Sequence, residues 1–285
     1  MMCHMAETIT PTLRGRRLAR DLRALRERSQ LTQAEAARRT GISKSQLSRI
    51  EAAKERASDE DVTKLLQLYG LDVDRHAAIL QLNKEAWQRG WWTAYDDAFS
   101  RNFLMLENQA PEICAYETML VPGLLQTPDY ARAVLGVRSN VEEEDLDRFV
   151  AGRMARKSIL TRSNPPAFSA VINEAALRQV IGGDAELIRK QCSELWTVAT
   201  ERPHVTVQVL PFSASLPAAL FGSFTLFNFP GDHGLDVAYS EDPLGEWYAE
   251  SNDQVTRLRV AFGDVARAAL SPEDSLRWLA DRTRE

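Results

Sequence analysis

The stretch LTQAEAARRTGISKSQLSRIEAAK, residues 31–54, has the rhythm of two short helices separated by a single glycine. Thr32 followed by Glu35 is a capping-box pattern that begins the first helix, and Gly41 suits the left-handed residue that ends it. The second helix begins at Ser43, where SKSQ again has capping-box spacing. Two helices joined by a short turn that contains glycine predict a helix-turn-helix.

The second of these helices, expected over residues 43–52, has an apolar and a polar side. Leu47 and Ile50 fall on the apolar side. The other side carries Lys44, Ser45, Ser48 and Arg49. A helix packed from behind and polar in front is typical of a recognition helix, which lies in the major groove of DNA.

Further helices are expected on both sides of this motif. Leucines recur at helical spacing over residues 13–29, and helices are also predicted over 58–70 and 73–88. The N-terminal domain, residues 11–89, is therefore predicted to be an all-α bundle of five helices.

Charge is distributed unevenly along the 285 residues. The net charge is −5, but residues 1–57 hold 13 Arg or Lys against 6 Asp or Glu, which gives +7 and leaves −12 for the remainder. A basic segment followed by an acidic remainder indicates a nucleic-acid-binding domain attached to an acidic body.

Residues 31–54 resemble the Xre, or lambda-repressor-like, helix-turn-helix family. The positions that match are Leu31, Thr32, Gln33, Ala37, Gly41, Ile42, Ser43, Leu47, Ser48, Ile50 and Glu51. Ala36 stands where the family usually has leucine, so one core contact is expected to be weaker. Ala53 stands where it usually has glycine, which is expected to alter the turn after the recognition helix. The resemblance implies a transcriptional regulator.

Base contacts are expected from the N-terminal end of the recognition helix. Lysine can hydrogen-bond the edge of guanine, glutamine that of adenine, and serine those of several bases. The candidates are therefore Lys44, Ser45 and Gln46. Gln46 also fits the helix cap, and both roles stay open. The candidates for phosphate contacts are Thr32, Gln33, Ser43, Ser48 and Arg49. Arg16 and Arg17 could pair with Glu51 instead of touching DNA.

The binding partner expected from these residues is double-stranded DNA, read by a homodimer. Two recognition helices in a dimer read a near-palindrome whose half-sites lie about 10 bp apart, or a multiple of that. The protein is also expected to regulate its own gene.

The remaining residues, 90–285, predict an α+β domain with a mainly antiparallel sheet, which makes the whole chain α+β. Strands are expected at 168–174, 205–211, 223–230, 235–242 and 245–250. Helices are expected at 128–135, 142–161, 184–201, 252–269 and 271–284. Trp196 is placed among the apolar residues of the third of these.

Two groups of aromatic residues in this domain each have two possible roles. The phenylalanines at the strands could pack the core of the sheet or line a ligand pocket, and their spacing favours the core; they are Phe212, Phe221, Phe224, Phe227 and Phe229. Residues 88–99, rich in tryptophan and tyrosine, could anchor the linker to the second domain or act as a signal-responsive or dimer-forming joint.

The sequence lacks the patterns of an enzyme, a metal site or a membrane protein. It contains no G-x-S-x-G and no phosphate-binding loop. Cys3, Cys114 and Cys192 have neither disulfide nor metal spacing. No apolar run is long enough to span a membrane, and the N-terminus has no secretory signal. We therefore expect a cytoplasmic protein that is not an enzyme and has no cofactor.

Several strings of the second half resemble the C-terminal domain of WhiJ-like regulators of actinobacteria. They are VPGLLQTPDYARAVL, INEAALRQVIGG, VTVQVLPF, GSFTLFNFP and LSPEDSL. The resemblance implies an Xre-type head fused to a regulatory or interaction domain, with a possible small protein partner encoded nearby. The alternative is an antitoxin-like module whose main role is to bind that partner.

Overall fold

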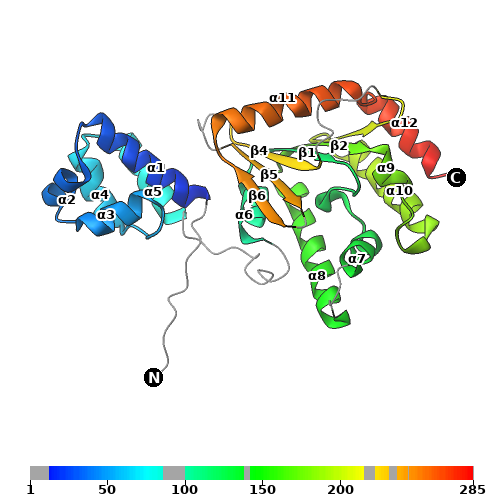
Figure 1. Cartoon of the computed structure of the whole chain (residues 1–285), viewed down its shortest axis with the longest axis horizontal. Helices are drawn as coiled ribbons and strands as arrows, with labels where there is room; N and C mark the ends of the chain where they lie inside the picture. Colours follow the sequence, from blue (N-terminus) through cyan, green and yellow to red (C-terminus); the bar gives the residue numbers. More distant parts are fainter. Residues whose placement is uncertain are drawn as a thin grey trace. The chain divides into compact units, whose positions relative to one another are not determined.

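The computed structural model describes residues 13–85, 100–137, 142–214, 222–230, 236–242 and 244–284. By internal contacts the chain divides into two units, Met1–Thr93 and Ala94–Glu285, which we call the head and the tail (Figure 1). The aromatic stretch 88–99 lies outside the described residues.

The described part of the head consists of five helices, which confirms the predicted all-α bundle (Figure 1). They are α1 (Leu13–Arg28), α2 (Gln33–Thr40), α3 (Lys44–Glu51), α4 (Asp59–Leu68) and α5 (Val73–Glu85). Their apolar faces meet in one core, in which Leu22, Leu47, Leu65 and Leu66 are fully buried.

The tail contains a six-stranded mixed sheet, which confirms the predicted α+β class. Its strands are β1 (Glu112–Glu117), β2 (Ala167–Asn173), β3 (Val205–Leu210), β4 (Phe224–Asn228), β5 (Val237–Asp242) and β6 (Gly245–Ala249). In space they follow the order β3-β2-β1-β4-β5-β6. The β1–β4, β4–β5 and β5–β6 pairs are antiparallel, but β1–β2 and β2–β3 are parallel.

Helices cover both faces of this sheet (Figure 1). They are α6 (Arg101–Gln109), α7 (Pro128–Gly136), α8 (Glu143–Arg156), α9 (Glu174–Arg178), α10 (Ala185–Glu201), α11 (Asn252–Ala268) and α12 (Pro272–Arg282). On one face, Val255 and Val265 of α11 pack on Tyr116 and Leu226 of the sheet. On the other, Phe103 of α6 packs against the ring of Phe227, with 5.5 Å between ring centroids.

Three of the α-helices and strands of the tail were not predicted from the sequence: β1, α6 and the short helix α9. The central strand β1 is buried on both faces from Ile113 to Tyr116, so its sequence does not alternate. The expectation of one helix to residue 161 was also wrong, because α8 ends at Arg156 and a 3₁₀ turn, Lys157–Leu160, follows.

The phenylalanine prediction is confirmed for Phe224 and Phe227, which are buried in the sheet, and wrong for Phe212, which is 63% exposed. Phe212 follows the end of β3, where the alternation of the strand no longer sets its direction. Trp196 was also misplaced, since it is 40% exposed on α10. Phe221 lies outside the described residues.

Candidate DNA interface

Side-chain caps fix where the two helices of the helix-turn-helix begin. The predicted capping box of α2 is confirmed: Glu35 N–H donates to Thr32 Oγ1 over 3.2 Å, and Thr32 N–H donates to Glu35 Oε2 over 2.9 Å. Ser43 caps α3, because its hydroxyl accepts from the N–H of Gln46 at 3.1 Å. Only this half of the second predicted box forms, since the Gln46 side chain is directed to α4 instead.

The turn between α2 and α3 depends on glycine. Gly41 has φ +76°, a left-handed conformation that side chains disfavour, and its N–H donates to Ala37 O over 2.9 Å. This confirms Gly41 as the end of α2. The chain can then turn through Ile42, which is buried, and begin α3 at once.

The rear of α3 is packed against the core of the head. Leu47 and Ile50 are buried, and α2 meets them with the small residues Ala36 and Ala37. Ala36, where leucine was the family expectation, has no exposed surface, so the smaller side chain leaves no opening to solvent. This packing sets the orientation of α3 in the head and directs its other side outward.

A buried ion pair joins the end of α3 to the other helices. The guanidinium of Arg26 donates twice to Glu51, Nε to Oε1 over 2.7 Å and Nη2 to Oε2 over 3.0 Å. Arg26 also donates to Leu31 O, and the Gln33 amide donates to Glu51 over 2.8 Å. Both charged side chains are almost inaccessible to solvent, and the bond to Glu51 raises the pKa of Arg26.

The expected pairing of Glu51 with Arg16 or Arg17 was therefore wrong. Arg26 lies on the inner side of α1 and reaches the end of α3, whereas Arg17 pairs with Asp21 on its own helix. The sequence shows which residues of α1 are basic, but it does not show which of them meets Glu51 at the end of α3.

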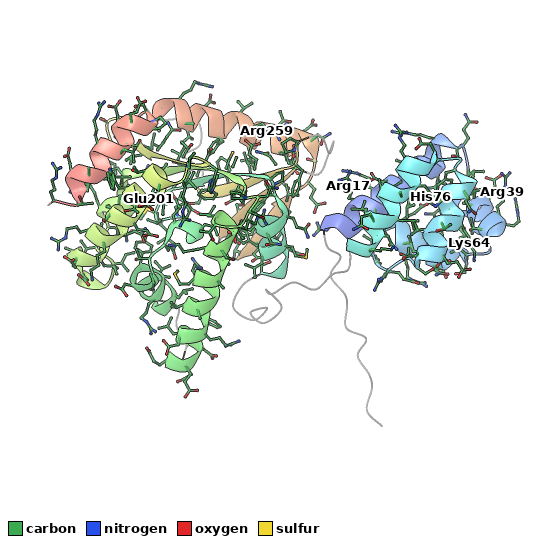
Figure 2. All side chains as sticks on the ribbon, turned by 180° about the vertical axis from the view of Figure 1, so that it is seen from behind. Arg17, Arg39, Lys64, His76, Glu201 and Arg259 are labelled. Carbon is green, nitrogen blue, oxygen red and sulfur yellow. The ribbon has the colours of Figure 1, made fainter. Side chains whose placement is uncertain are left out.

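The outward side of α3 is polar and exposed. Its exposed residues are Lys44, Ser45, Ser48 and Arg49. The start of α2 lies near the same surface, and there Thr32 is exposed and Gln33 half-buried. Arg39 of α2 also extends from the head (Figure 2). The surface combines hydroxyl, amide and cationic groups, which are the groups that bind phosphates and base edges.

Two carboxylates on neighbouring segments hold side chains of α3. Asp61 on α4 accepts from Gln46 Nε2 over 3.2 Å, and Glu55 accepts from Arg49 Nε over 2.5 Å. An ionised carboxylate only accepts hydrogen bonds, so the amide nitrogen of Gln46 must face Asp61. Sequence reasoning missed both acids, because they lie outside the motif and contact it only through the fold.

The turn after α3 contains the second departure from the Xre pattern. Ala53 has φ +55°, so a residue with a side chain occupies the left-handed position where glycine was expected. Its N–H donates to Ile50 O and that of Lys54 to Arg49 O, which is a Schellman motif. The turn is thus retained, and the Ala53 methyl group is buried in the head.

The described part of the tail offers little reactive chemistry. Burial raises the pKa of the Cys114 thiol to about 12 and that of Cys192 to about 11, so neither is a reactive thiolate near neutral pH. No group of three or more metal-ligating side chains occurs among the residues described. Within the same residues, no helix has the length and apolar character needed to cross a membrane.

Comparison with known families agrees with this division of the chain. Residues 17–79 match a helix-turn-helix domain, the class found in DNA-binding regulators. Residues 100–281 match the family described as a domain of unknown function, DUF5753, and the chain belongs to that family. Comparisons with curated proteins and with solved structures give no match.

Proposed function

We propose that this chain is a sequence-specific transcriptional regulator that binds double-stranded DNA through its head and catalyses no reaction. The observation that carries the proposal is the exposed polar side of α3, whose orientation is set by Leu47, Ile50 and the buried Arg26–Glu51 pair. The Xre type and the WhiJ-like, actinobacterial character belong to the same proposal.

In this mechanism α3 enters the major groove with its N-terminal end toward the bases. Lys44, Ser45 and Gln46 contact base edges. Because Asp61 holds the amide nitrogen of Gln46, its Oε1 is presented as an acceptor for an exocyclic amine, such as N6 of adenine. The phosphate contacts are made by Thr32, Gln33, Ser43, Ser48 and Arg49.

The functional unit we propose is a homodimer that reads a near-palindrome upstream of its own gene, in the cytoplasm. The tail would supply dimerisation or bind a partner or signal. A second candidate, an antitoxin-like module that mainly binds a small protein, is favoured by one observation: Trp247 and Leu244 are strongly exposed at one edge of the acidic tail.

Fluorescence anisotropy tests the DNA-binding role. The full chain would be titrated against the duplex upstream of its gene and a scrambled duplex of equal length, both across a range of salt. Lys44→Ala should cost roughly 1–3 kcal/mol on the specific duplex and change base preference. Arg49→Ala should weaken binding to both duplexes alike. It should also reduce the slope of log affinity against log salt concentration by about 1.

Two results would contradict the proposal. Equal and steeply salt-dependent binding of both duplexes would mean that only the basic charge of the head is acting. A Lys44→Ala variant with unchanged base preference would remove the assignment of the base-reading end of α3. Sedimentation at the working concentration tests the dimer, which a single species of monomer mass would exclude.

A further inference from the structure

The two edges of the tail sheet differ in how their backbone groups are covered. At the β3 edge, Leu270 N–H donates to Val209 O and Val209 N–H donates to Ser275 Oγ, both over 2.9 Å. The side chain of Gln208 also donates to Ala266 O in α11 and to Leu270 O in the segment between α11 and α12. The end of α11, this segment and the start of α12 therefore cover the β3 edge.

At the opposite edge, β6 pairs with β5, and no other described strand adjoins it. Figure 1 shows β6 along this margin of the sheet, beside β5. An edge strand presents unpaired backbone N–H and C=O groups that can accept another strand. Proteins usually protect such edges with charges and keep large apolar side chains away from them.

The β6 edge follows only half of that pattern, because it has charged side chains but also exposes large apolar ones. Leu244, in the β5–β6 turn, is 90% exposed, and Trp247 is 60% exposed. Trp247 is also held in place, since its Nε1–H donates to Asp242 Oδ2 over 3.1 Å. A fixed, exposed tryptophan costs little conformational entropy on binding, which favours a docking contact over a protective device.

The charge around this edge indicates the chemistry of the partner. Asp236, before β5, pairs with Arg259 of α11. Residues 241–250 contain four further carboxylates and no lysine or arginine: Glu241, Asp242, Glu246 and Glu250. They lie on both faces, because successive side chains of a strand alternate. Asp242 and Trp247 share the face of α11, while Glu246 and Tyr248 share the face on which Ser100, at the start of α6, bonds Tyr248.

We propose that the β6 edge is a docking site for a basic, extended segment of a partner protein, which adds to the sheet as a further strand. Backbone bonds to β6 would provide the pairing. An arginine of the partner would stack on Trp247 beside the Asp242 carboxylate, an arrangement suited to a guanidinium. A second copy of this chain fits less well, because pairing β6 with β6 would bring the same carboxylates together.

This inference deepens the interaction role proposed for the tail and does not depend on DNA binding by the head. The probe is a fluorescein-labelled peptide of alternating arginine and valine, bound to the full chain and followed by anisotropy. Its control is the same peptide N-methylated at alternate amides, which keeps the charge but cannot pair along one backbone edge.

The matched variants are Trp247→Ser and Trp196→Ser, which leave the net charge unchanged. Trp196 lies on α10, which packs against β3 at the other edge of the sheet. We expect Trp247→Ser to lower the affinity for the probe peptide about tenfold, because the aromatic and cation–π contact is lost. Trp196→Ser should have no effect, and the N-methylated peptide should bind weakly to the wild type.

Equal binding of the two peptides, or an equal response of the two tryptophan variants, would overturn the proposal. So would a wild-type dimer that Trp247→Ser converts to monomer, since a second copy would then occupy β6. DNA affinity measured on the same samples separates this failure from failure of the regulator role. Because Trp247 is exposed, its replacement should leave the circular dichroism spectrum unchanged.

Discussion

Replacing Glu51 with alanine tests whether the buried ion pair holds the recognition helix in place. Glu51 accepts two hydrogen bonds from Arg26 and a third from Gln33. Glu51→Ala removes all three and leaves the guanidinium of Arg26 buried, with the more exposed carboxylate of Glu27, 3.6 Å away, as its remaining ion-pair partner.

The expected loss is large compared with the stability of the head. Removing one partner of a buried pair costs about 3–5 kcal/mol, mostly because the remaining charge stays desolvated. A domain of the size of residues 13–85 has a free energy of unfolding of roughly 4–11 kcal/mol. Glu51→Ala should therefore remove at least about a quarter of that stability, and at the low end of the range it unfolds the head, so DNA binding should weaken although the side chain is not proposed to touch DNA.

Hydrogen exchange of the full chain, read by mass spectrometry of its peptides, measures this loss locally. Slowly exchanging amides of α1 and α3 should lose protection by a factor that corresponds to about 3–5 kcal/mol. Peptides of the tail should be unaffected. The matched control is Glu107→Ala, which breaks the equally buried Arg156–Glu107 pair of the tail and should reduce protection only there.

A double variant separates the ion pair from simple packing. Arg26→Met with Glu51→Leu removes both charges, so most of the lost stability should return. A loss below about 1 kcal/mol in Glu51→Ala would contradict this account, because it would mean that Arg26 finds water without cost. Failure of the double variant to recover would show that the hydrogen bonds to Leu31 and Gln33 matter more than the charge.

Three further changes have defined outcomes. Glu55→Gln should release Arg49 for contact with phosphate and tighten binding to a scrambled duplex by roughly two- to fivefold in anisotropy titrations. The gain is small because an exposed ion pair is worth at most about 1 kcal/mol. Unchanged affinity would mean that the pair does not compete with DNA. Gln30→Gly should stabilise the head by about 0.5–1 kcal/mol in hydrogen exchange, since Gln30 is exposed at φ +55° in a Schellman motif; a loss of stability would contradict this. Burial raises the pKa of Glu117 to about 7 from 4.5, so its stabilising contribution is full below pH 4.5 and is lost as the pH rises through 7. Glu117→Gln should flatten that decline in urea denaturation of the tail followed by tryptophan fluorescence, and an unaltered pH profile would exclude Glu117 as its source.

The local structure of the head could be read from the sequence because local interactions determine it. Thr32 with Glu35, Ser43 and Gly41 each act within a few residues, and the structure confirms these caps and the turn. The buried network could not be predicted, since Arg26 and Glu51 are 25 residues apart and several arginines of α1 have similar spacing. Helical spacing does place Arg26 on the buried side of α1 with Leu18 and Leu22, but which side chain it meets there depends on how the helices pack.

The tail was harder to predict because burial on both faces removes periodicity. The alternating segments that became β3 and β5 were found, whereas the strand at the centre of the sheet, β1, was not. The parallel pairing of β1 with β2 depends on a connection that includes α7 and α8, and no local pattern encodes it. The carboxylates beside α3 were missed for a similar reason, since Asp61 acts on Gln46 across 15 residues.

These carboxylates change how recognition by α3 should be understood. In the free head, Arg49 already has a hydrogen-bond partner, so its contact with a phosphate exchanges one bond for another, whereas Gln46 can keep its bond to Asp61 while its Oε1 accepts from a base. Glu55 and Asp61 also place negative charge near the path of the phosphates, which disfavours every duplex alike. A duplex that offers good base contacts to Lys44 and Ser45 can offset this cost, and a random duplex cannot. The acids beside the recognition helix would therefore lower the affinity for every duplex by a similar factor, and discrimination between sequences would still come from the base contacts of Lys44 and Ser45.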